Sequence, residues 1–154
     1  MRINIPRTRP LTAETLAKLE AEYGPIPDSY RVFLSQYDGT TPEENIFKVD
    51  ERRSAGVERF IPAADIIRIR GAVEGFPMEM LPFASSSGGN LIYLDPKLAT
   101  IHYWDHEDDS CDVKVANSFD EFLALLEKFD LQQIKLKPKQ VKKVRVNPDF
   151  KPKF

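Results

Sequence analysis

The densest collection of chemically active side chains lies in one short run of the sequence. It reads Asp105-His106-Glu107-Asp108-Asp109-Ser110-Cys111-Asp112. A calcium-binding EF-hand loop that began at Asp105 would need glycine at its sixth position and glutamate at its twelfth. Ser110 and Ala116 stand at those positions. The run therefore does not predict a calcium loop.

A zinc site would have to be assembled from residues that match no zinc-binding pattern. His106 and Glu107 are not followed by the second histidine of a zinc-binding helix, and the only other histidine, His102, falls on a predicted strand. Such a site would need both histidines together with Cys111. We therefore expect no metal and no other cofactor.

The run Ser85-Ser86-Ser87-Gly88-Gly89-Asn90 has the composition of a phosphate-binding loop but not its context. A phosphate loop ends in Lys-Ser or Lys-Thr and leads into a helix, whereas residues 91–94 are typical of a strand. We interpret this run as a turn in which Gly88, Gly89 and Asn90 supply positive φ angles.

No catalytic arrangement emerges from the remaining nucleophiles. The spacing gives no indication that Ser87 meets His102 or His106, as a serine nucleophile would require. The carboxylates around Cys111 disfavour its thiolate. The sequence therefore favours a protein that is not an enzyme.

Several patterns define the elements that must position these residues. Short apolar runs at 81–84, 91–94 and 101–104, bounded by turn residues, predict three strands, and 113–116 predicts a fourth. Helical spacing predicts helices at 11–23, with Thr12 as N-cap, and at 28–38. A capping-box pattern at Ser118 and Glu121 predicts a helix from Phe119 to Phe129, with the Glu121 side chain bonded back to Ser118.

The region between these patterns predicts less regular structure. Residues 40–58, with Ile46, Phe47 and Val49 embedded, are expected to form a loop with one short strand. A brief helix follows Pro62, and Gly71, Gly75 and Pro77 then break it. Together the patterns predict an α+β fold, with a mainly antiparallel sheet of about four to six strands packed by helices.

Length and charge bound the class of protein. A chain of 154 residues predicts one domain, and a single cysteine with no apolar N-terminal run favours a cytoplasmic protein without a membrane segment. We expect an extended lead-in at 1–10, a domain at 11–131 and a basic extension at 132–154. From Lys135 onward the formal charge is +7, whereas residues 1–134 carry −9.

Four segments, taken in order, resemble the SUKH superfamily, which includes fungal cell-wall-synthesis regulators and many bacterial immunity proteins. They are LEAEYG at 19–24 with IPDSYRVFL at 26–34, LPFA at 81–84 with GNLIYLD at 89–95, IHYWDHE at 101–107, and ANSFDEFL at 116–123. The resemblance implies an α+β fold and a non-enzymatic binding role. Bacterial members resemble antidotes that bind and block toxins, with nucleases among the common targets.

The acidic run then has two interpretations: a solvated loop, or a surface complementary to a basic partner. Our leading hypothesis is an immunity protein that covers a cognate toxin, such as a nuclease. The binding residues would be Asp105, Glu107, Asp108, Asp109 and Asp112. The alternatives are a regulatory scaffold that binds cellular proteins, and nucleic-acid binding by the basic extension, which we disfavour against an edge strand or a contact with the acidic domain. The oligomeric state is left open.

Overall fold

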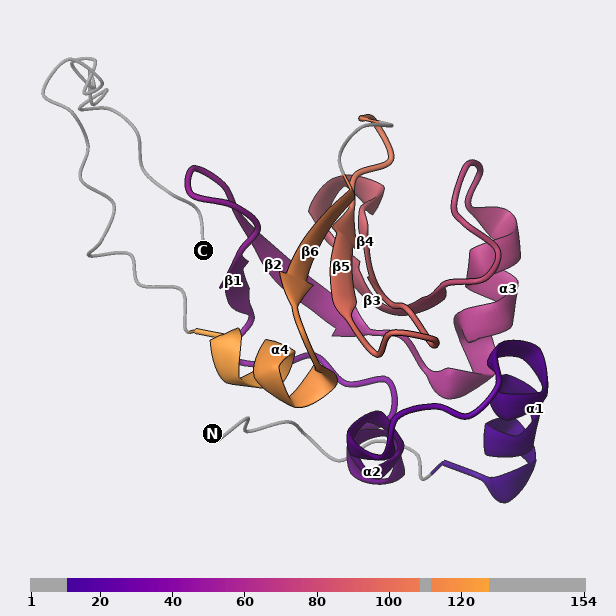
Figure 1. Ribbon diagram of the computed structural model, residues 1–154. Coiled ribbons are helices and arrows are strands. Elements are labelled where there is room, and N and C mark those ends of the chain that lie inside the picture. Colours follow the sequence, from indigo (N-terminus) through magenta and orange to yellow (C-terminus); the bar gives the residue numbers. More distant parts are fainter. Residues whose placement is uncertain (1–10, 109–111, 128–154) are drawn as a thin grey trace, which may run out of the picture.

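The computed structural model describes residues 11–108 and 112–127, which form an α+β fold (Figure 1). Within them, six antiparallel strands make one curved sheet, nearly closed into a barrel, with four α-helices around it. The predicted fold class is therefore confirmed. The strands are β1 (Ile46–Lys48), β2 (Ser54–Phe60), β3 (Leu81–Ser86), β4 (Leu91–Leu94), β5 (Ile101–Trp104) and β6 (Asp112–Ala116). The helices are α1 (Ala13–Tyr23), α2 (Asp28–Tyr37), α3 (Ile66–Ala72) and α4 (Phe119–Leu125), with 3₁₀ turns η1 (Ala63–Asp65) and η2 (Ser87–Gly89).

The sheet is a simple meander, in which each strand pairs with the next one along the chain. Strands β3, β4 and β5 are the three predicted apolar runs, and β6 is the predicted fourth strand. A register shift lies between Pro82 and Ala84 in the pairing of β3 with β4. Proline has no backbone N–H for the ladder, and an irregularity of this kind accommodates it within a central strand.

Strand β2 contradicts the expectation of only one short strand between residues 40 and 58. It pairs with β1 on one side and β3 on the other, so the meander begins earlier than predicted. Of its seven residues only Val57 and Phe60 are buried, and the register shifts between Val57 and Arg59. Buried and exposed residues do not alternate regularly along β2, because its pairing with β3 is irregular at this shift.

The N-terminal helices begin as predicted, and the third helix differs in detail. The side chain of Thr12 accepts a hydrogen bond from the Thr15 backbone at 3.2 Å, and Gly24, with φ of 80°, ends α1. The segment after Pro62 forms η1 and then α3. Gly71 lies inside α3, which continues to Ala72 and ends before Gly75 and Pro77, the other two predicted breakers.

Helix α4 starts with the predicted cap, but one of its two predicted bonds is wrong. The Ser118 hydroxyl accepts from the Glu121 backbone N–H at 3.1 Å. The Glu121 carboxylate accepts from the backbone N–H of Asn117 at 2.7 Å and not from that of Ser118. The helix ends at Leu125, and Phe129, its predicted end, lies outside the described residues.

The core lies between the sheet and helices α2 and α4, and it is largely aromatic. Tyr30 and Phe33 of α2 both contact Phe119 of α4, with ring centroids 5.0 and 5.1 Å apart. Phe83 of β3 contacts Phe119 and Phe122 at 5.4 and 5.5 Å. All five side chains are at most 5% exposed, so removing one ring is expected to cost about 3–5 kcal/mol.

The opposite face of the sheet is covered by the loop between α3 and β3. Phe76 of this loop packs edge-on against Tyr93 of β4 and Trp104 of β5, with centroids 5.6 and 5.3 Å away. This contact brings the loop beside the end of β5, where the acidic run begins.

The described chain ends against its own first strand. After α4, the backbone of Glu127 exchanges hydrogen bonds with Ile46 at 2.8 and 3.0 Å, forming an isolated antiparallel bridge. In Figure 1, α4 lies across one end of the curved sheet, between β1 and β6. The helix therefore fills the gap that keeps the sheet from closing completely.

Candidate functional site

The loop between β5 and β6 carries most of the acidic side chains that the sequence analysis selected. Asp105, Glu107 and Asp108 lie in its described part, and Asp109 lies outside the described residues. The Asp105 carboxylate accepts from the Glu107 backbone N–H at 3.0 Å, and its carbonyl accepts from the Asp108 N–H at 3.4 Å. The backbone thus makes a tight turn, from which the Glu107 side chain extends with 83% of its surface exposed.

Asn90 attaches this loop to the neighbouring turn between β3 and β4. Its Oδ1 accepts from the backbone N–H of His106 at 3.1 Å and lies 2.8 Å from Nδ1 of the same residue. Its Nδ2 donates to the hydroxyl of Tyr103, a buried β5 residue, at 2.7 Å. One amide side chain therefore holds the first turn of the loop in place.

The turn that presents Asn90 follows the prediction in part. Gly88 and Gly89 have φ of 76° and 87°, as expected, but Asn90 has φ of −75°, so its predicted positive φ is wrong. Asn90 is already extended at the entry to β4, a conformation that leaves its side chain available for the loop. The sequence marks Asn90 as a turn residue and gives no sign of its contact with His106.

Asp112 belongs to a hydrogen-bonded group on the sheet. Its Oδ2 accepts from the Tyr93 hydroxyl at 2.5 Å, and its Oδ1 lies 3.4 Å from Nδ1 of His102. Nε2 of His102 lies 2.9 Å from the Thr100 hydroxyl, and the His102 ring stacks on Tyr93 at 5.0 Å. Burial, reinforced by the hydrogen bond to Asp112, raises the pKa of Tyr93 well above its ordinary value.

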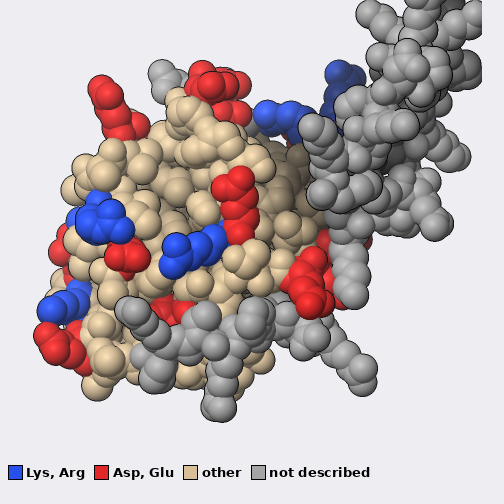
Figure 2. Space-filling model, turned by 180° about the vertical axis from the view of Figure 1, so that it is seen from behind, with Lys and Arg blue, Asp and Glu red and all other residues tan. Residues whose placement is uncertain are grey.

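The described part of the chain is strongly acidic. Residues 11–108 and 112–127 contain ten Lys or Arg and 21 Asp or Glu, a formal charge of −11. Among them, Asp105 and Glu107 form no ion pair with Lys or Arg. In Figure 2, acidic side chains stand at the upper edge, where Figure 1 places the β5–β6 loop, and others are spread over the rest of this face. Asp105 and Glu107 therefore present negative charge that ion pairs with Lys or Arg of the described chain do not neutralise.

An open pocket of about 480 Å³ lies beside the loop. His106 forms part of its wall together with Gly89 of the β3–β4 turn, and Val73, Glu74 and Gly75 after α3 complete the lining. Glu74 is not among the residues predicted from the sequence, because it lies far from the acidic run in the chain and the packing of Phe76 brings its loop there. We call this the His106 pocket.

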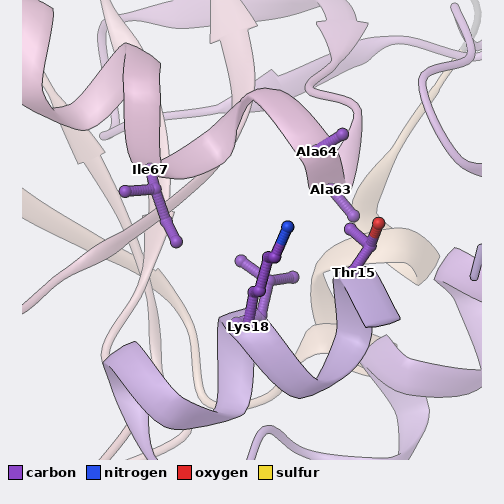
Figure 3. Close-up of a pocket in the computed structure, with 6 residues that line it drawn as sticks. Thr15, Lys18, Ala63, Ala64 and Ile67 are labelled. Atoms are coloured by element: carbon purple, nitrogen blue, oxygen red, sulfur yellow. The ribbon is translucent and has the colours of Figure 1, made fainter. Parts of the chain in front are cut away.

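A second hollow lies between α1 and the η1–α3 segment (Figure 3). Its volume is about 100 Å³, and Lys18 extends from α1 toward Ala63 and Ile67 across it. Small-molecule sites usually enclose about 300–1,000 Å³. This hollow is therefore too small to be a strong candidate for a ligand site.

The described residues offer no converging metal ligands. Within 11–108 and 112–127, no three His, Cys, Asp or Glu side chains are grouped so that they could hold a metal ion, and Cys111 lies outside these ranges. His102 and His106 have separate partners, Asp112 and Asn90. In the same residues, every helix is too short or too polar to cross a bilayer.

Comparisons with known proteins agree with this fold. The family model described as the SMI1/KNR4 family (SUKH-1) matches residues 10–125. A relative from Bacillus subtilis (strain 168), an SPbeta prophage-derived uncharacterized protein named YokK, is 32% identical over an alignment 139 residues long, and the match covers 73% of this chain and 72% of the relative. The family match reaches from the residue before the described structure into the last turn of α4, and the chain therefore belongs to the SMI1/KNR4 family (SUKH-1).

Proposed function

We propose that this protein is an immunity protein that binds and neutralises a cognate bacterial toxin. Family membership supports the proposal, because the family is typical of immunity proteins and is generally non-catalytic. The Bacillus relative is prophage-derived, which suits a gene carried on a mobile element. The proposed contact surface consists of Asp105, Glu107, Asp108, Asp109 and Asp112.

The observation that carries the proposal is the arrangement of Asp105 and Glu107. Backbone hydrogen bonds and the Asn90 side chain fix the turn on which they stand, yet neither forms an ion pair with Lys or Arg within the described residues. A fixed loop loses little conformational entropy when a partner binds. Its charge is also available to attract a basic partner and to accelerate association.

A nuclease toxin fits this surface on chemical grounds. Nuclease active sites attract phosphate groups, so they present a positive potential to which a carboxylate surface is complementary. The toxin would then be blocked because the immunity protein covers the face that the nucleic acid needs. The same reasoning makes association fast at low salt and slower as salt screens the charges.

The test uses the full chain and the toxin domain encoded beside it. We expect the double variant Asp108→Asn with Asp109→Asn to lower the association rate roughly tenfold at low salt, with a smaller loss at high salt. The matched control, Glu14→Gln with Glu51→Gln, removes the same charge from exposed sites on α1 and the β1–β2 turn. Stopped-flow binding and calorimetry measure the effect. Equal behaviour of the two double variants would remove the acidic surface from the proposal.

Affinity purification tests the function itself. Capture of the neighbouring toxin, and protection of cells that express it, are the expected results. Recovery of a housekeeping complex in place of the toxin would favour the regulatory scaffold.

We further propose that the domain spans residues 11–131, between a lead-in at 1–10 and a basic extension at 132–154. Binding of duplex DNA that is lost on truncation after Asp130 would assign that extension to nucleic acid.

A further inference from the structure

The hydrogen bonds around Asn90 determine which nitrogen of His106 carries the proton. The backbone N–H of His106 can only donate, so the side-chain atom of Asn90 that it meets must be the oxygen. The same oxygen lies 2.8 Å from Nδ1 of the His106 ring, and it can only accept. Nδ1 must therefore be the protonated nitrogen, and in neutral His106 the lone pair is on Nε2.

This lone pair faces another acceptor. Nε2 of His106 lies 3.9 Å from a carboxylate oxygen of Glu107, a distance too long for a hydrogen bond. Nε2 of neutral His106 and the carboxylate of ionised Glu107 both lack a hydrogen, so neither can donate a hydrogen bond to the other. Two acceptors held this close together on an anchored loop suit a third group that only donates.

The His106 pocket gives a donor to Nε2 a place to lie, because His106 forms part of its wall. Glu74 adds a carboxylate to the lining, and Glu107 stands next to His106 in the chain. Gly75 and Gly89, which lack side chains that could fill the space, have φ of 78° and 87°, a conformation that strains other residues. A Cβ atom at Gly89 would lie in van der Waals contact with the His106 ring, at 3.5 Å, so glycine keeps this part of the wall open.

We propose that the His106 pocket receives a lysine or arginine side chain of the protein partner, which donates to His106 Nε2 and is attracted by Glu74, which also lines the pocket, and by the nearby Glu107. Ammonium and guanidinium groups have donors and no acceptor, which matches a site built from acceptors. An anion is disfavoured because the two glutamates repel it. The inference rests on the proposed function, since it names the chemistry of the group that the partner contributes.

The first test uses small probes and the full chain labelled with ¹⁵N. Acetyl-arginine amide should cause saturable chemical-shift changes at Gly75, Gly89 and the His106 ring. Acetyl-citrulline amide has nearly the same shape without the charge and should cause none. The ring spectrum of the free protein should show a protonated Nδ1. Equal effects of both probes, shifts spread over all acidic positions, or saturable binding of inorganic phosphate in place of arginine would each overturn the proposal.

The second test changes the pocket and keeps the fold. Glu74→Gln retains the shape of an exposed side chain and should abolish the saturable arginine shifts. Glu79→Gln is the matched control, because it removes an exposed carboxylate of the same α3–β3 loop that does not line the pocket. The control variant should bind the arginine probe as the unmodified chain does. Identical titrations of the two variants would exclude Glu74 and with it the proposed site.

Binding of the neighbour-encoded toxin separates this inference from the proposed function. Glu74→Gln should raise the Kd of the toxin complex about tenfold, because it removes one of the charges that attract the cation. If Kd is unchanged while the Asp108 and Asp109 substitutions weaken binding, the pocket proposal falls and the immunity function stands. If the arginine probe binds but the toxin does not, the pocket stands and the proposed function falls.

Discussion

Two regions of this molecule use carboxylates in opposite ways. At the corner where α1 meets α2 and α3, Glu20 and Glu22 pair with arginines, at 2.5 Å to Arg31 and 2.7 Å to Arg70. In the β5–β6 loop, Asp105 and Glu107 have no such cation within the described residues. The helical corner therefore uses its negative charge in its own packing, whereas the loop holds Asp105 and Glu107 in position without an ion pair to Lys or Arg.

The environment of Arg70 makes the first of these uses clear. The Arg70 side chain is only 7% exposed, and its guanidinium lies 5.1 Å from the centre of the Tyr23 ring. It also donates to the carbonyl of Met78 at 3.0 Å, which connects the corner to the loop before β3. Burial raises the pKa of Tyr23, although the nearby Arg70 acts in the opposite direction. Arg70 is thus part of the interior, whereas its partner Glu22 is partly exposed.

The largest effect should follow from breaking this corner. We expect Arg70→Ala to lower the free energy of unfolding by about 3 kcal/mol, because it removes a buried cation that contacts Glu22, Tyr23 and Met78. Urea denaturation measures the change. Glu22→Gln should cost less, since the Glu22 side chain is 43% exposed and water can replace the lost ion pair. A cost for Arg70→Ala within 0.5 kcal/mol, roughly that of an ordinary surface change, would contradict the comparison.

A smaller effect should follow from releasing the loop. Asn90→Ala removes the amide that contacts His106 and Tyr103, and we expect a loss of about 1–2 kcal/mol. Hydrogen exchange of the His106 amide should become faster, while amides in α2 keep their relative protection. If the His106 amide exchanges as slowly as before, the turn is held by the Asp105 backbone contacts and Asn90 is not its anchor.

The Tyr93–Asp112 bond should appear in the dependence of stability on pH. The pKa of Tyr93 is raised in the folded state, so above about pH 10 the unfolded chain loses this proton while the folded chain keeps it. The stability that Tyr93 contributes is therefore present below this pH and decreases as the pH rises. Tyr93→Phe should lower the free energy of unfolding by about 1 kcal/mol at neutral pH. The stability of this variant should also decrease less steeply as the pH rises. Parallel curves for the two proteins, measured by thermal unfolding from pH 8 to 11, would exclude this linkage.

The smallest effect on stability should come from the loop carboxylates themselves. Glu107→Gln with Asp108→Asn should change the free energy of unfolding by less than about 0.5 kcal/mol, because both side chains are exposed. The same variant should bind the toxin more slowly. Denaturant titration and binding kinetics on one preparation compare the two properties. A stability loss above about 1 kcal/mol would show that these carboxylates support the fold, as those at the corner do.

Local patterns predicted most of this fold, because the relevant forces act over a few residues. The apolar runs became β3, β4 and β5, and Ser118 caps α4 as its position indicates. Strand β2 escaped prediction because its irregular pairing breaks the alternation that burial usually imposes. The hydrogen-bond donor predicted for the Glu121 side chain was wrong by one residue, because a sequence pattern does not determine which of two adjacent backbone N–H groups the carboxylate contacts.

The charged residues of the candidate site could be predicted from the sequence, but the residues that position them could not. Asp105, Glu107 and Asp108 stand out in the sequence because they are consecutive or nearly so. Asn90 and Glu74 join them only through tertiary packing, since separate turns bring them to the loop. No periodicity or spacing carries that information in a single sequence. Whether Asp105 and its neighbours bind a partner remains a prediction.

The bridge between Ile46 and Glu127 has a consequence for how the domain forms as it is synthesised. Each strand of the meander pairs with the one that left the ribosome just before it, so pairing can advance with translation. The bridge is different, because it joins the first strand to the end of the described chain. The free edge of β1 therefore stays unpaired until Glu127 has left the ribosome. Synthesis of the segment that contains Glu127 sets the earliest time at which this bridge can form.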